Sequence, residues 1–321
     1  MAAQKETMQE PNLNDSPRGL ISLIDLLLLP GLPFIALVAH IIPHKVWPKF
    51  AKWCQTYCQS LMPVKPTDIE NCVQHYLRTA PGDHLPEAVS LDFLSNQLLM
   101  PFLLTRVLLP FDQTIKCELE GQEYIDAGLH DGKGVIIWDS HFFFANFMTK
   151  IVLHRAGYSA VHLSHKRHGF SKSWFGMNVL NRIWVAAETK YLAERVVLSY
   201  EEPKLAMNRL AEQLQKNAVV TITVRDTAHH PVEVPFLNHV LRVAPGAPVL
   251  AKKTGAQLIP AFTVHQSNGH YKTTLQAPIK ISHDADTKTA VRTAVADYAR
   301  RLEPFVREYP GQWSDWSWLK S

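Results

Sequence analysis

From residue 114 onward, the chain alternates short apolar runs with longer segments whose apolar residues recur at helical spacing. This alternation is typical of β-α-β units, in which successive strands run parallel because a helix returns the chain to the start of the sheet. Short runs rich in Val and Ile predict strands that are buried on both faces. We therefore predict an α/β fold with a mostly parallel central sheet flanked by helices.

The individual elements follow from the same patterns. Strands are predicted at residues 115–120, 135–138, 160–164, 182–187, 218–224 and 258–265. Helices are predicted at residues 121–129, 143–155, 173–180, 201–216, 245–254 and 287–307. The alternating segment 270–281 is predicted to form a hairpin with the strand before it, across the dipeptide Asn268-Gly269, which suits a tight hairpin turn.

The first third of the chain has a different character. Residues 1–17 are polar and contain two prolines, so we predict that they are disordered. Residues 20–42 are apolar and long enough to reach across the roughly 30 Å hydrocarbon layer of a bilayer. Asp25 and the sequence Pro30-Gly31-Leu32-Pro33 interrupt this run. Two alternatives remain open: a kinked transmembrane helix, or a hairpin-like segment that dips into one leaflet.

The segments that follow complete the predicted organisation. Lysines at positions 45, 49 and 52 place the C-terminal side of the apolar run on the cytoplasmic side, by the positive-inside tendency. Residues 88–109 are apolar but carry Asp92 and Arg106, which favours an amphipathic helix that lies on a membrane or lines an acyl groove. We predict a membrane anchor at 18–45, a helical membrane-associated segment at 46–112 and an α/β domain at 113–321.

The charge distribution is uneven. The net charge is +4, and no Asp or Glu occurs between Ser140 and Ala187. A basic interval of this length favours an anionic ligand or an acidic partner, although a basic surface without a partner is the alternative. His162, His165 and His168 recur at every third position, but the apolar residues between them favour a strand rather than a metal-binding helix face. We expect no metal site and no nucleic-acid partner.

One histidine stands out by its position. The predicted strand 135–138 ends just before His141, and a helical pattern begins after it. In open α/β sheets, ligands bind beyond the carboxyl ends of the strands. A histidine at that edge, with the polar Asn146 five residues later, suggests a general base with an orienting residue. The alternative is a structural histidine that hydrogen-bonds with its neighbours at a strand end.

Five motifs occur along the α/β part of the chain. They are Gly132-Lys133-Gly134-Val135-Ile136, His141 at the strand end, Asp226-(seven residues)-Val234-Pro235-Phe236, Thr254-Gly255-Ala256-(three residues)-Pro260, and Pro310-x-Gln312-Trp313-x-x-Trp316. In this order and spacing, they resemble the bacterial lipid A biosynthesis acyltransferases, the lauroyl and myristoyl transferases of the lysophospholipid acyltransferase superfamily. The resemblance runs from about residue 115 to the C-terminus and implies a glycerolipid acyltransferase-like fold.

The resemblance implies an enzyme of the bacterial inner membrane whose catalytic domain faces the cytoplasm. It would move a fatty acyl chain from acyl carrier protein, or from coenzyme A, to a hydroxyl or amine of a lipid acceptor, with no metal or organic cofactor. A relative acting on a lysophospholipid, a glycolipid or a polyene-type specialised lipid is an alternative. In such a reaction, the neutral imidazole of His141 would remove the acceptor proton during attack on the thioester carbonyl.

Basic residues of the chain are candidates for stabilising the oxyanion and for binding the acidic substrates. The Arg225 region or a backbone amide could stabilise the developing oxyanion, and we include Arg225 and Asp226 among the substrate-binding candidates. A basic rim that includes Lys166, Arg167 and Lys172 would suit an acidic carrier protein or a phosphorylated acceptor. Arg167 is assigned although His165 occupies the place where the family has its arginine.

The chain departs from the family at two positions. The family has Asp or Glu five residues after its histidine, where this chain has Asn146, and replacing the acid of an analogous triad by its amide costs about 10⁴ in rate. Asp139, two residues before His141, or Asp226 could supply the missing charge; otherwise the chain is a non-catalytic binder of carrier protein or lipid. Asn238 replaces a family glycine, and asparagine tolerates the left-handed conformation such a turn needs.

Overall fold

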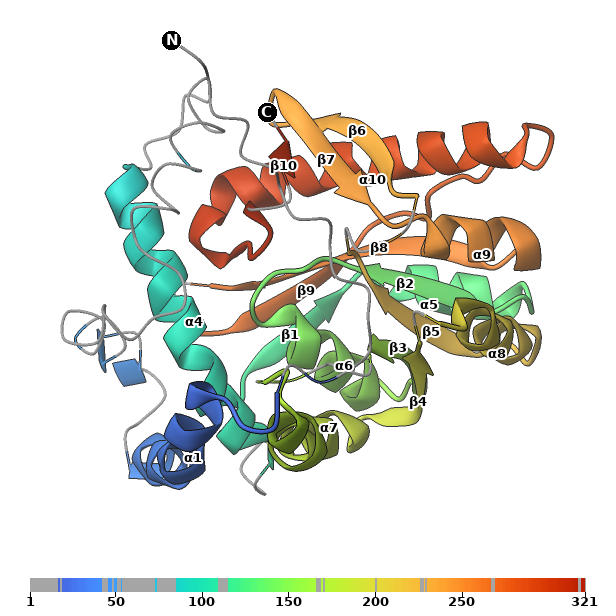
Figure 1. Cartoon of the computed structure of the whole chain (residues 1–321). Coiled ribbons are helices and arrows are strands. Elements are labelled where there is room, and N and C mark those ends of the chain that lie inside the picture. Colours follow the sequence, from blue (N-terminus) through green and yellow to red (C-terminus); the bar gives the residue numbers. More distant parts are fainter. Residues whose placement is uncertain are drawn as a thin grey trace, which may run out of the picture.

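The computed structural model describes most of the α/β part of the chain and two N-terminal helices (Figure 1). The described residues are 17, 19–41, 46–47, 49–50, 53, 73, 85–108, 115–165, 169, 171–199, 201–225, 228, 230–266, 269–316 and 319–320, without the side chains at 24, 146 and 320. All but residue 17 of the predicted disordered segment 1–17, and most of 46–84, therefore lie outside the described residues.

Within the described residues, seven strands form one central sheet in the order β1-β9-β8-β2-β5-β3-β4. The strands are β1 (Cys117–Glu120), β2 (Val135–Asp139), β3 (Ala160–His165), β4 (Leu192–Leu198), β5 (Val219–Thr223), β8 (Gln257–His265) and β9 (Tyr271–Leu275). The run from β8 to β4 is parallel, whereas β9 pairs antiparallel with β8 and β1 lies parallel to β9. The prediction of a mostly parallel sheet is confirmed.

Helices cover both faces of this sheet (Figure 1). They are α5 (Gln122–His130), α6 (Ala145–Arg155), α7 (Asn181–Thr189), α8 (Pro203–Gln215), α9 (Gly246–Thr254) and α10 (Thr287–Glu308). Strand β2 shows why two layers are needed, because its side chains alternate between the faces. Trp138 packs on Tyr298 of α10, with ring centroids 4.3 Å apart, and Ile137 packs into a second buried cluster with Ile125 of α5.

One predicted strand is wrong. Residues 182–187 belong to helix α7, which a single-turn π-helix, η4 (Gly176–Leu180), precedes. The β-branched and aromatic residues there suggested a strand, but Leu180, Trp184 and Ala187 recur at helical spacing and are buried. Trp184 packs on Phe147 of α6, with ring centroids 4.7 Å apart. The fourth strand is instead β4, whose half-exposed edge position gives it a weak apolar pattern.

A small second sheet was also missed by the sequence patterns. Its strands are β6 (Val232–Phe236), β7 (His239–Val243) and β10 (Leu319–Lys320), in the order β10-β7-β6. The turn between β6 and β7 has positive φ at both Leu237 (49°) and Asn238 (62°), as hairpin turns with a matching twist require. The expected left-handed turn at Asn238 is confirmed, and a strand rather than a helix follows it directly.

Two long apolar helices lie together at one side of the domain (Figure 1). They are α1 (Leu23–Ile41), which stays helical through its two prolines, and α4 (Pro86–Leu108). Among the described residues, only Pro86–Leu108 is long and apolar enough to cross a membrane, and 56% of that apolar window is buried inside the protein; Asp25–Ile41 is a shorter apolar helix.

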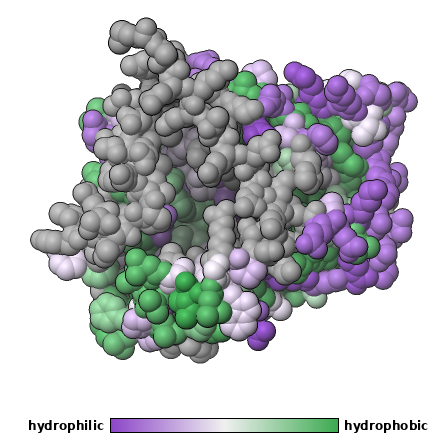
Figure 2. Space-filling model, in the orientation of Figure 1, coloured by the Kyte–Doolittle hydropathy of each residue, from purple (hydrophilic) through white to green (hydrophobic). Residues whose placement is uncertain are grey.

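The outer face of α1 remains uncovered by protein. Leu23, Phe34 and Ile41 are 74%, 65% and 70% exposed. Figure 2 shows an apolar area, in green, at the lower left of the molecule, where Figure 1 draws α1. The first turn of α1 is docked on the domain through Asp25, whose buried carboxylate accepts hydrogen bonds from Ser173 Oγ (2.5 Å) and Ser22 N (2.7 Å). These contacts lower the pKa of Asp25 to about 2, against the opposing effect of burial.

Candidate active site

His141 lies two residues beyond β2, at the carboxyl edge of the parallel strands. Strand β2 is at the centre of the sheet, between β8 and β5, and all five of its residues are buried. Ser140 N donates to Ala261 O of β8, which fixes the chain just before the histidine (3.0 Å). The side chain of His141 is 18% exposed, so a group in solution can reach it while most of the ring is held by protein.

The carboxylate on the His141 ring is that of Asp315, near the C-terminus. Nδ1 of His141 is 2.5 Å from Oδ1 of Asp315, whose side chain is 3% exposed. A carboxylate can only accept, so Nδ1–H donates and Nε2 is the basic nitrogen of the neutral ring. Burial raises the pKa of Asp315 above its ordinary value, while His141 and Arg225 favour the charged form.

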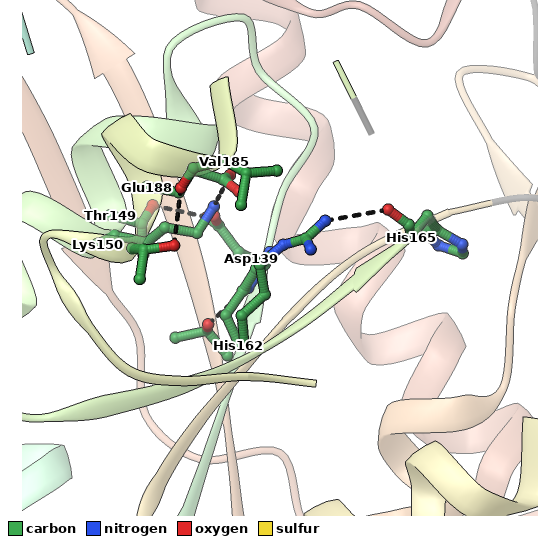
Figure 3. Close-up of polar contacts among 10 residues, drawn as sticks. Asp139, Thr149, Lys150, His162, His165, Val185 and Glu188 are labelled. Atoms are coloured by element: carbon green, nitrogen blue, oxygen red, sulfur yellow. Dashed lines mark hydrogen bonds and ion pairs between the residues drawn. The ribbon is translucent and has the colours of Figure 1, made fainter. Parts of the chain in front are cut away.

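Asp139, predicted as the substitute partner of His141, makes different contacts. Its Oδ1 accepts a hydrogen bond from Thr149 Oγ1 of α6 (3.0 Å; Figure 3). The Thr149 hydroxyl is also 2.9 Å from that of Thr263. Complete burial raises the pKa of Asp139 to about 8. Asp139 is the last residue of β2 and points toward α6 inside the core, whereas His141 lies beyond the end of the strand, where the alternation of faces no longer applies. The structure thus pairs His141 with Asp315 and not with Asp139.

The structure describes only some of the other catalytic and substrate-binding candidates. Asn146 lies in the first turn of α6, and its side chain is outside the described part of the structure. Lys166, Arg167 and Asp226 are also outside the described residues. Arg225, directly after β5, is near enough to Asp315 to act on its charge.

A small polar cavity accompanies Arg225 at this edge of the sheet. It measures about 20 Å³, which is room for about one water molecule, and it lies at the ends of β3 and β5. Its lining residues are His162, Leu163, Ser164, His165, Thr223 and Arg225. Arg225 thus lines a small polar cavity at this edge of the sheet, and its charge acts on Asp315.

The basic interval that the sequence shows is partly internal. Lys150 forms a buried ion pair with Glu188, with 2.7 Å between Nζ and Oε1, which joins α6 to α7 (Figure 3). His162 is also buried, and its Nδ1 is 2.8 Å from the hydroxyl of Thr221 (Figure 3). Neither side chain therefore contributes to a basic surface, although Lys172 is exposed.

Sequence reasoning missed Asp315 as a site residue. The residue lies inside the terminal motif, between Trp313 and Trp316, where it was one unassigned position among aromatic residues. One signal was available: the chain lacks an acid at position 146 but has one, Asp315, within the terminal motif. Nothing in the sequence gave the direction from which a residue 174 positions away approaches the ring.

Comparison with known proteins agrees with the motifs. A family model described as bacterial lipid A biosynthesis acyltransferase matches residues 110–321, which include the whole central sheet, His141 and Asp315. A search of curated proteins found no match to the chain. Since the family model covers well over half of the chain, this protein belongs to the bacterial lipid A biosynthesis acyltransferase family.

Proposed function

We propose that this protein transfers a fatty acyl chain from a thioester, on acyl carrier protein or coenzyme A, to a hydroxyl or amine of a lipid acceptor, with His141 as the general base. Late acylation of a lipid A-type acceptor is the first candidate reaction. The observation that carries the proposal is the position of His141: partly exposed at the carboxyl edge of the sheet, with Nδ1 on a buried carboxylate, in a member of an acyltransferase family.

The proposed step is a direct acyl transfer. Nε2 of His141 removes the proton of the acceptor hydroxyl or amine as that atom attacks the thioester carbonyl carbon. The bond from carbon to sulfur then breaks, and the proton passes from the imidazole to the departing thiolate. The positive charge of Arg225 acts on the carboxylate of Asp315, so we propose Arg225 as an electrostatic stabiliser of the oxyanion.

We also propose that the protein works at a membrane, on the cytoplasmic side of the bacterial inner membrane. Apolar side chains on α1 are widely exposed, which suits insertion into a lipid leaflet. A groove of about 320 Å³ lies between α1, α4 and α7, and its lining is almost wholly apolar, with Leu29, Leu108 and Ile183 among its residues. An apolar lining supports contact with hydrocarbon, as expected for an enzyme with lipid substrates.

Two other functions deserve a test. The same chemistry could serve a lysophospholipid, a glycolipid or a polyene-type lipid, because the proposed step involves only the hydroxyl or amine of the acceptor. The presence of Asn146 in place of an acid also motivates a non-catalytic binder of acyl carrier protein or lipid.

The test uses the full-length protein in lipid vesicles with acyl carrier protein thioesters and candidate acceptors, followed by lipid mass spectrometry. We expect acyl transfer by the wild type and a loss of about 10²- to 10⁴-fold in His141→Ala. His283→Ala, at an exposed histidine far along the chain, is the matched control and should keep full activity. Equal product from wild type and His141→Ala would reject the proposal, and binding without any product would favour the binder.

A further inference from the structure

We infer that Asp315 supplies the negative charge that is missing at position 146, and that the C-terminal strap, defined as residues 309–316, belongs to the active site. This inference rests on the proposed function, because it assigns Asp315 as the positioning residue of the proposed base. The acid thus comes from the far end of the chain rather than from the helix that follows the histidine.

The strap is paired with the segment that carries His141. Phe143 N donates to Gln312 O (3.0 Å), Ser314 N donates to His141 O (3.2 Å), and Phe142 and Trp313 form an antiparallel bridge. The hydroxyl of Ser314 donates to His141 O as well (2.5 Å). Because these bonds hold the two segments in one register, the backbone that positions the histidine also positions the acid.

Gln312 ties the strap to the central sheet. Its side chain is 7% exposed and forms two hydrogen bonds with the main chain of His265, at the end of β8. Oε1 accepts from His265 N (2.7 Å), and Nε2 donates to His265 O (2.6 Å). Since β8 is the neighbour of β2, this contact fixes the strap relative to the strand that leads to His141.

Packing against α4 and within the strap limits its movement further. Trp313 and Trp316 are each 1% exposed, and Trp316 Nε1 donates to Pro310 O (3.0 Å). Asn96 of α4 donates to Gly311 O (3.0 Å). A Cβ atom at Gly311 would lie 2.3 Å from a carboxylate oxygen of Asp92, so any larger residue would have to displace Asp92 of α4. The motif Pro-x-Gln-Trp-x-x-Trp is therefore the structure that holds Asp315 in place.

The chemistry requires a charge at this point. When His141 takes the acceptor proton, the ring becomes positive, and an anion on Nδ1 stabilises that state and keeps the tautomer. Asn146 has no charge to offer, and Asp139 is engaged with Thr149. The Ser314 hydroxyl, whose one hydrogen is shared with His141 O, also lies 3.1 Å from the oxygen of Asp315 that meets His141, which favours the ionised form of Asp315.

The kinetic test compares wild type with Asp315→Asn, an isosteric change. We expect kcat to fall by about 10²- to 10⁴-fold with KM changed by less than about threefold, as for loss of the orienting acid in an analogous triad. In the His141→Ala background, Asp315→Asn should cause no further loss, because the acid acts only through the ring. The control is Asp297→Asn on α10, which removes an Asp from an ion pair with Arg301 away from His141 and should leave kcat unchanged.

A spectroscopic measurement separates this inference from the proposed function. A proton NMR signal of Nδ1–H, shifted downfield by the short bond to a carboxylate, should be present in wild type and lost in both Asp315→Asn and His141→Ala. Full activity of folded Asp315→Asn, additive losses in the double variant, or the absence of this signal in wild type would overturn the inference. An inactive wild type that keeps the signal would contradict the acyltransferase proposal instead.

Discussion

His141 and Asp315 are joined by a hydrogen bond of 2.5 Å although 174 positions separate them in the chain. The histidine follows the central strand β2, and the acid sits on a strap that runs antiparallel to the residues just after that strand. The pair has the arrangement of a base and its orienting acid, assembled from opposite ends of the α/β domain.

This arrangement predicts the result of restoring the family's acid. Asn146→Asp should change acyl transfer by less than about threefold, because the Nδ1 side of His141 is already occupied by a carboxylate. Steady-state rates of the purified variant in vesicles measure this directly. A gain of about 100-fold or more would mean that Asp315 does not serve the ring in the working enzyme.

Removing the Gln312 clamp should affect both stability and rate. Gln312→Ala leaves the main-chain N–H and C=O of His265 without their strap partners, at a cost of about 1–3 kcal/mol in the free energy of unfolding. We expect kcat to fall more than KM rises, because Asp315 loses its fixed position. Chemical denaturation and kinetics on the same preparation measure the two effects.

The control for Gln312→Ala is Gln213→Ala, which removes a hydrogen bond to Glu194 at a partly exposed site of α8. It should cost less than about 1 kcal/mol and leave kcat unchanged. If Gln312→Ala were as mild as Gln213→Ala in both measurements, the strap would not depend on the clamp.

Asp139 predicts a pH-dependent stability. Burial raises its pKa from 3.8 to about 8, so between these values the folded state binds a proton that the unfolded state has released. The free energy of unfolding must then fall as pH rises from about 4 to about 8. Asp139→Asn lacks this effect and still offers an oxygen to Thr149. Its melting temperature should therefore exceed that of wild type by more at pH 8 than at pH 5; a constant difference would contradict the prediction.

The buried ion pair of Lys150 and Glu188 predicts a strong asymmetry between single and double changes. Lys150→Met leaves the Glu188 carboxylate buried without its cation, and we expect a loss of about 3–5 kcal/mol in the free energy of unfolding. Lys150→Met with Glu188→Leu should recover most of that loss, because no charge remains buried. Thermal and urea unfolding of the wild type and the two variants decide this, and equal losses in the single and double variants would contradict the prediction.

Local patterns in the sequence determined much of the sheet and the position of His141 at its edge. The runs that became β2, β3, β5 and β8 are apolar on both faces, and such runs have few alternatives once helices alternate with them. His141 followed from the same logic, because the end of a central parallel strand is where ligands bind. The five motifs indicated the family, and the family model agrees with them.

Only the tertiary structure decided the contacts that depend on distant partners. The sequence of helix α7 resembles that of a strand, and the helix is explained only by the packing of Trp184 on Phe147. Strand β4 lacks a clear apolar pattern because it lies at the edge of the sheet. The contact between His141 and Asp315 also depends on a segment that is distant in the sequence. Sequence spacing pointed to Asn146 and Asp139, which are near in the chain, whereas hydrogen bonds and packing of the strap bring in Asp315. Periodicity determines which face a residue takes within its own element; it contains no information on which remote segment will be folded against that face.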